Sequence, residues 1–183
     1  GTLDESFELL TLIQTGKSDL HPIILLETEG SGYWQPVIDF CENVLIEQGF
    51  ISPEDLNLFQ RLHDPEEAAD VICRFYANYQ SQRYVNGRLV LRLLEAPSPE
   101  MLARLNRAYV DIITEGEMEI IEPTPAEVRD DDSLDDARVA FWFDRRHFGR
   151  LRMLIDDLNA VVGERTSVHP PSPFHEEQAD RSW

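Results

Sequence analysis

The first five residues, Gly1-Thr2-Leu3-Asp4-Glu5, place a glycine, a hydroxyl and a carboxylate where an apolar helical pattern begins. By spacing alone, Thr2 and Glu5 form a capping box, in which the Thr2 hydroxyl caps the helix and the Glu5 side chain reaches back. The same geometry suits phosphate, because a helix N-terminus offers unpaired N–H groups and the positive end of the helix dipole. The two interpretations differ over Glu5, which either folds back on Thr2 or faces a ligand.

Other chemistry-bearing residues form weaker patterns. An acidic run at 130–136 lacks the glycine and the spacing of a calcium loop, so we expect a solvated loop there. The basic segments RYVNGRLVLR and FDRRHFGRLR are expected to flank ordinary strands and helices, although they could also meet a phosphate or a partner helix. No nucleophile–base constellation can be assembled, and we predict no metal site and no cofactor. The histidines show no ligand spacing; they are His21, His63, His147, His169 and His175.

The charge balance narrows the class of partner. The chain of 183 residues carries 16 basic and 35 acidic side chains, for a formal net charge of −19. Such a surface repels phosphate lattices, so we expect no nucleic-acid partner and no docking on an anionic membrane. No apolar run approaches the roughly 18 residues that span a bilayer. Cys41 and Cys73 lie in apolar, helix-like stretches, so we expect buried, reduced thiols and a cytoplasmic location.

The elements that would position Gly1–Glu5 alternate between helix and strand. Apolar residues at helical spacing predict a helix over 3–15, and the continuous run Ile23–Leu26 predicts a strand buried on both faces. The predicted elements that follow are a helix over 33–48, a helical turn capped by Ser52, an edge strand over 58–63, and a helix from Asp64 to Tyr79. This order is typical of a doubly wound α/β sheet.

The second part of the chain shows a different order of predicted strands and helices. Residues 86–162 predict a β-α-β-β-α unit, with a turn at Asn86–Gly87 and a Pro-rich, then acidic loop before the last strand. The last helix should turn Phe148, Leu151 and Leu158 inward. We therefore divide the chain into an α/β part over 1–82, an α+β extension over 83–162 and a disordered tail over 163–183.

The stretch GTLDESFELLTLIQTGK, followed by HPIILL, resembles the signature of the Lonely Guy family of nucleotide-processing, Rossmann-like proteins, many once labelled lysine decarboxylase-like. The family hallmark is the motif P-G-G-x-G-T-x-x-E, and Gly1, Thr2 and Glu5 match its second half. The resemblance covers the shared Rossmann core over roughly 1–80, with GFISPEDL similar to the larger bacterial members. The later basic segments resemble a C-terminal extension of some bacterial members.

The resemblance implies an activity and roles for three residues. Characterised members cleave the N-glycosidic bond of nucleoside 5′-monophosphates, cytokinin riboside monophosphates among them, and release the free base and ribose 5-phosphate. Gly1 and Thr2 would then hold the 5′-phosphate, and Glu5 would be the catalytic carboxylate beside an oxocarbenium-like transition state. A homodimer or higher homo-oligomer is also implied. The alternative is a non-catalytic Rossmann module that binds a nucleotide or molybdenum cofactor.

The resemblance also implies that part of the family's active site is missing from this sequence. The P-G-G-x half of the motif and the arginine that the family uses upstream are absent from the 183 residues. We therefore expect the C-terminal fragment of a larger protein, with part of a Rossmann-like sheet and half of a site. The isolated 183 residues are expected to show negligible hydrolase activity.

Overall fold

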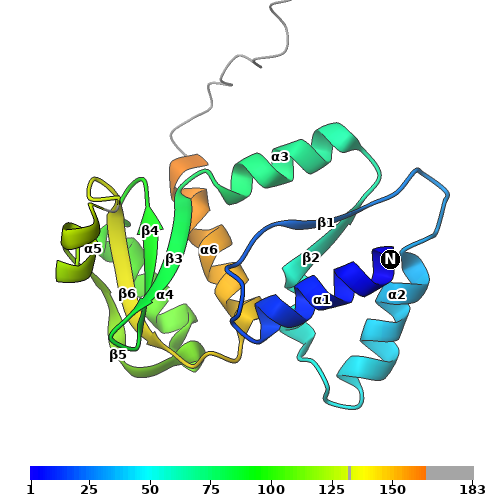
Figure 1. The fold of residues 1–183 in the computed structure, drawn as a ribbon, viewed down its shortest axis with the longest axis horizontal. Coiled ribbons are helices and arrows are strands. Elements are labelled where there is room, and N and C mark those ends of the chain that lie inside the picture. Colours follow the sequence, from blue (N-terminus) through cyan, green and yellow to red (C-terminus); the bar gives the residue numbers. More distant parts are fainter. Residues whose placement is uncertain (132, 164–183) are drawn as a thin grey trace, which may run out of the picture.

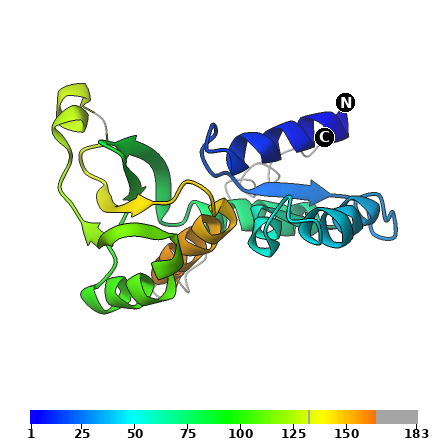
Figure 2. The same cartoon turned by 90° about the horizontal axis from the view of Figure 1, so that it is seen from below.

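The computed structural model describes residues 1–131 and 133–163 and shows a mixed α/β protein. Two β-sheets lie at opposite ends of the molecule, and helix α6 (Phe148–Gly163) lies between them (Figures 1 and 2). The predicted tail, with His169 and His175, lies outside the described residues except for Gly163, which ends α6.

The N-terminal part is built around two parallel strands. Its elements, in chain order, are α1 (Thr2–Gln14), β1 (Ile23–Leu26), α2 (Gln35–Phe40), the π-helical η1 (Cys41–Ile46), the 3₁₀-helical η2 (Pro53–Leu58), β2 (Phe59–Leu62) and α3 (Pro65–Phe75). The strands β1 and β2 pair in parallel, from Ile23 opposite Phe59 to Leu26 opposite Leu62. The predicted alternation of helix and strand is confirmed here, whereas a doubly wound sheet stays a prediction.

The C-terminal part is an antiparallel sheet with the strand order β3-β4-β6-β5. Its elements are β3 (Tyr79–Val85), β4 (Arg88–Leu93), α4 (Pro99–Ala108), η3 (Val110–Ile112), β5 (Ile113–Ile120), α5 (Pro125–Asp130), β6 (Ala137–Phe143) and α6. The predicted turn at Asn86–Gly87 is confirmed, and both residues have positive φ angles, 52° and 91°.

Two predictions are wrong, one at the junction of the two parts and one in the loop before β6. The helix expected to reach Tyr79 ends at Phe75, and the strand β3 begins at Tyr79 instead. The sequence of β3 contains no apolar run, and only Tyr79 and Gln82 of the strand are buried. Antiparallel pairing with β4 through the hairpin therefore stabilises β3 as a strand. The boundary predicted between 82 and 83 falls inside this strand. The loop expected before β6 contains α5, which Thr124 caps by accepting the N–H of Glu127.

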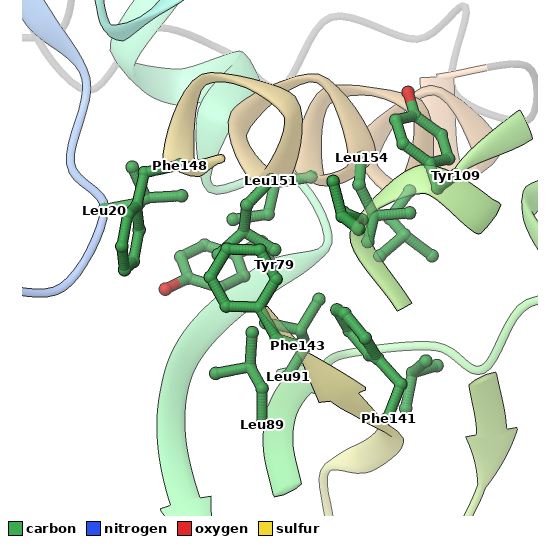
Figure 3. Close-up of a cluster of buried hydrophobic side chains, with 14 of the residues drawn as sticks. Leu20, Tyr79, Leu89, Leu91, Tyr109, Phe141, Phe143, Phe148, Leu151 and Leu154 are labelled. Atoms are coloured by element: carbon green, nitrogen blue, oxygen red, sulfur yellow. The ribbon is translucent and has the colours of Figure 1, made fainter. Parts of the chain in front are cut away.

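A continuous hydrophobic core joins the two parts. Helix α6 covers the antiparallel sheet, and its buried face contains the predicted residues Phe148, Leu151 and Leu158 (Figure 3). Ile13 of α1 and Leu20, which follows α1, belong to the same cluster. The position of α1 therefore depends on the packing of the C-terminal part.

A buried ionic cluster fixes α5 on the sheet. Arg92 of β4 lies directly opposite Arg138 of β6, and both side chains donate to Oε1 of Glu127, at 2.8–3.0 Å and 3.2 Å. The other carboxylate oxygen accepts the N–H and the hydroxyl of Thr124, at 2.9 and 2.8 Å. Arg138 also donates to the carbonyl of Ser133, so the cluster ties the acidic loop to the sheet.

The two cysteines differ in burial. Cys41 is buried in η1, as predicted, and burial raises the pKa of its thiol. Cys73 is exposed, so the prediction for this residue is wrong. Helix α3 buries Ala68, Val71 and Phe75 along a narrow stripe, and Cys73 lies roughly opposite Val71 on the helix, where it faces solvent.

Candidate functional site

Helix α1 begins one residue earlier than the capping-box pattern predicts. Gly1 is the N-cap, Thr2 is the first helical residue, and no side chain caps the helix. The Glu5 N–H donates to the carbonyl of Gly1 at 3.0 Å, the first bond of the helix. The predicted capping box between Thr2 and Glu5 is therefore wrong, because Glu5 is the fourth helical residue and its side chain has no bond to Thr2.

The three predicted site residues lie together at an open helix end. Gly1, Thr2 and Glu5 are all exposed. Within the described part of the chain, the N–H groups of Leu3 and Asp4 donate to no acceptor. Unpaired N–H groups at the positive end of a helix dipole can bind an oxyanion, and Glu5 follows within one turn. The roles of these residues in binding and catalysis stay predictions.

A second group of polar residues, which the sequence analysis missed, lies where the parallel strands end. Glu27 directly follows β1, its side chain is only 3% exposed, and it forms an ion pair with Arg61 of β2. The carboxylate also accepts the N–H of Trp34 at 3.2 Å. The Trp34 indole donates to the carbonyl of Leu26 at 3.1 Å, and Arg61 also donates to the side chain of Gln35. These bonds fix the loop between β1 and α2.

The charge state of Glu27 follows from these contacts. Desolvation by burial raises its pKa, but the N–H of Trp34 and the guanidinium of Arg61 act against it, and the net pKa is below the usual value. Glu27 is therefore ionised at neutral pH. The Nη2 group of Arg61 donates to no described residue, and 25% of the side chain is exposed, so one face of this cation remains available to a ligand.

The two groups lie at the same end of the molecule. In Figures 1 and 2 the N-terminus of α1 and helix α2 lie toward the same end of the molecule, with β1 between them in the second view. Gln35, the first residue of α2, accepts from Arg61. Ligands of open α/β sheets bind outside the carboxyl ends of the strands. Glu27 and Arg61 occupy this end of the parallel pair, so the arrangement can present N–H groups, a guanidinium and a carboxylate to a phosphorylated ligand. A carboxylate directly after an apolar strand is the signal that could have identified Glu27.

Residues 1–72 match the protein family described as "Possible lysine decarboxylase". The match covers less than half of the 183 residues. The matched segment contains α1, both parallel strands and most of α3, and it confirms the resemblance to the Lonely Guy family that G-T-x-x-E and the following strand suggested. It includes Glu27 and Arg61 as well as Gly1, Thr2 and Glu5. A search of curated proteins finds no match to the chain.

The described residues contain neither a membrane-spanning helix nor a metal-ligand cluster. Over residues 1–131 and 133–163, every helix is too short or too polar to cross a membrane. The same residues contain no group of three His, Cys, Asp or Glu side chains placed to hold a metal ion.

Proposed function

We propose that this sequence belongs to a hydrolase that cleaves the N-glycosidic bond of nucleoside 5′-monophosphates. The observation that carries the proposal is the open N-terminus of α1, with Glu5 in its first turns, inside the segment that matches the family. The 5′-phosphate binds at the unpaired N–H groups of α1, helped by the Thr2 hydroxyl. Arg61 adds a positive charge at the same end of the parallel strands.

The reaction requires little beyond positioning and charge. As the bond between C1′ and the base nitrogen breaks, positive charge develops on the ribose ring. The Glu5 carboxylate stabilises this charge and orients the water that adds to C1′. The base leaves with its bonding electrons and takes up a proton, and ribose 5-phosphate remains. A phosphate held at a rigid helix end fixes the position of the ribose relative to Glu5. Binding energy from the phosphate thereby lowers the barrier to cleavage, because it orients the reacting bond.

A second copy of the chain is part of this proposal. Several apolar side chains of the N-terminal part are exposed to solvent. Leu3, Leu9, Leu26, Tyr33 and Phe40 are between 36% and 52% exposed. We propose that they contribute to a homodimer interface, which light scattering on the purified protein and its Leu9→Lys variant would test. A wild-type protein that is monomeric at all concentrations would contradict it.

The hydrolase proposal is tested with the full-length gene product and a panel of nucleoside 5′-monophosphates. Released base is quantified by chromatography for the wild type, for Glu5→Gln and for Glu8→Gln, a matched exposed control on the same helix. We expect Glu5→Gln to lose at least about 100-fold in kcat with nucleotide affinity retained, since it removes charge stabilisation from the transition state. Turnover by Glu5→Gln at the wild-type rate would remove Glu5 from the mechanism. Nucleotide binding with no release of base by the wild type would favour the non-catalytic binding module instead.

A further inference from the structure

Two adjoining hollows lie at the other end of the parallel strands, between α3 and α6. Their volumes are about 360 and 210 Å³, and they share Gln60, Val71, Arg152 and Asp156. The smaller hollow is also lined by Ile23, with which β1 begins. This α3–α6 cleft, defined by Asn57, Gln60, Arg74, Phe75, Arg152 and Asp156, is therefore separate from the candidate site at the carboxyl ends.

A buried arginine lies at the wall between the hollows. Arg152 is 9% exposed, and its guanidinium lies over the ring of Phe75, with its carbon 4.6 Å from the ring centroid. Its Nε atom donates to both carboxylate oxygens of Asp156 at 3.1 Å. The two Nη groups donate to no residue in the described part of the chain. A guanidinium with both terminal nitrogens unclaimed is the fork that binds carboxylate and phosphate groups bidentately.

Further donors surround this guanidinium. Arg74 of α3 is exposed, and its side chain forms no ion pair or hydrogen bond with a described residue. The side-chain amides of Asn57 and Gln60 likewise have no described partner. Two arginines in one cleft stand out in a chain with a net charge of −19. Asp156 adds one acceptor, which suits a ligand that also carries a hydroxyl or amino donor.

We propose that the α3–α6 cleft binds a small organic anion, a phosphate ester or a carboxylate, that also carries a hydrogen-bond donor. The anionic group pairs with the Nη groups of Arg152 and with Arg74, the donor reaches Asp156, and the apolar part lies on Val71 and Phe75. The larger hollow is within the size range of small-molecule sites.

The position of the cleft gives such a ligand a structural effect. Arg74 belongs to the N-terminal part of the chain, whereas Arg152 and Asp156 belong to α6 of the C-terminal part. A ligand that contacts both holds α3 and α6 together, and it stabilises the folded chain by mass action. This inference does not depend on the hydrolase proposal, because it involves neither Glu5 nor the N-terminus of α1.

Titration calorimetry on the 183-residue chain at low ionic strength tests the cleft. The probes are inorganic phosphate, ribose 5-phosphate and citrate, so that phosphate and carboxylate sources are distinguished. The variants are Arg74→Ala, Arg74→Glu and Arg152→Gln, with Arg129→Ala as an exposed control on α5. We expect at least one probe to bind, Arg74→Ala to weaken it roughly tenfold, Arg74→Glu to weaken it further, and Arg129→Ala to leave it unchanged.

Each outcome decides the inference. Because Arg74 is exposed, its variants are expected to fold even where Arg152→Gln does not. Binding that survives Arg74→Glu unchanged lies elsewhere and overturns the proposal, as does the absence of binding by all three probes. A Thr2→Ala chain keeps its affinity for the probe if the cleft is the site. A loss of affinity in Thr2→Ala alone would assign the anion to the end of α1 and would leave the hydrolase proposal intact.

Discussion

Gly149 of α6 lies against the backbone of Glu54 in η2, so closely that no side chain fits between them. A β-carbon at position 149 would collide with the Glu54 carbonyl and would lie 2.7 Å from the Asp55 nitrogen. The same η2 segment holds α1, because the Asp55 carboxylate accepts the side-chain amide of Gln14 at 3.1 Å. The C-terminal part of the chain therefore positions α1, and with it Glu5, through a contact that only glycine allows.

We expect Gly149→Ala to destabilise the chain by about 3 kcal/mol or more, because backbone atoms on both sides must move. Urea denaturation measures the change. Gly116→Ala is the control, since Gly116 has a left-handed φ of 65° but a β-carbon there would meet open space. It should cost only about 1 kcal/mol. Equal losses in the two variants would show that the close contact with η2 has no energetic weight.

The pH dependence of stability should report on Glu127. Burial raises its pKa, but the Thr124 groups and the two guanidinium groups outweigh burial, and the pKa falls from 4.5 to about 2. Because the folded-state pKa lies below the unfolded-state value, the carboxylate stabilises the fold fully above about pH 4.5, and this contribution is lost as the pH falls toward 2.

Glu127→Gln leaves two arginines around a neutral amide, and we expect it to cost about 3 kcal/mol at pH 7. The difference from wild type should shrink between pH 4.5 and pH 2 as the wild-type carboxylate takes up its proton. Urea midpoints measured across this range check both statements. Glu117→Gln, at an exposed position on β5, serves as the control, and a gap that stays constant with pH would contradict the assignment.

The ion pair of Glu27 and Arg61 should control the loop between β1 and α2. Removal of the guanidinium in Arg61→Ala leaves a buried carboxylate without a counter-charge, so we expect a fall of several degrees in Tm. The loop should then loosen around Trp34, and tryptophan emission should shift to the red. Glu27→Gln/Arg61→Ala should recover part of the loss, because the unpaired charge is gone. A double variant less stable than Arg61→Ala would contradict this explanation.

The parts of the fold that were predicted correctly are those that local periodicity determines. The inward face of α6 and the position of β1 follow from side-chain spacing, which the sequence contains directly. The predicted burial of β1 on both faces is wrong, because only Leu25 is buried and Leu26 is exposed. The ion pair between Glu27 and Arg61 joins residues 34 positions apart, and it exists because β1 and β2 pair in one register. Such contacts depend on tertiary structure, as does β3, whose sequence gives no strand signal of its own.

Thr2–Glu5 and Thr124–Glu127 share the pattern T-x-x-E, and their comparison shows where pattern reasoning fails and leads to a last prediction. The backbone of Thr124 is extended, so this residue is the N-cap: its hydroxyl caps α5, and Glu127 reaches back to it. Thr2 is itself the first helical residue, with Gly1 as the N-cap, and the same four-residue pattern forms no box. We expect Thr124→Ala to cost about 1 kcal/mol and Thr2→Ala less than about 0.5 kcal/mol, by urea denaturation. Equal losses at the two positions would indicate that Thr2 caps α1 in solution, and the N–H groups assigned to a phosphate would then be occupied.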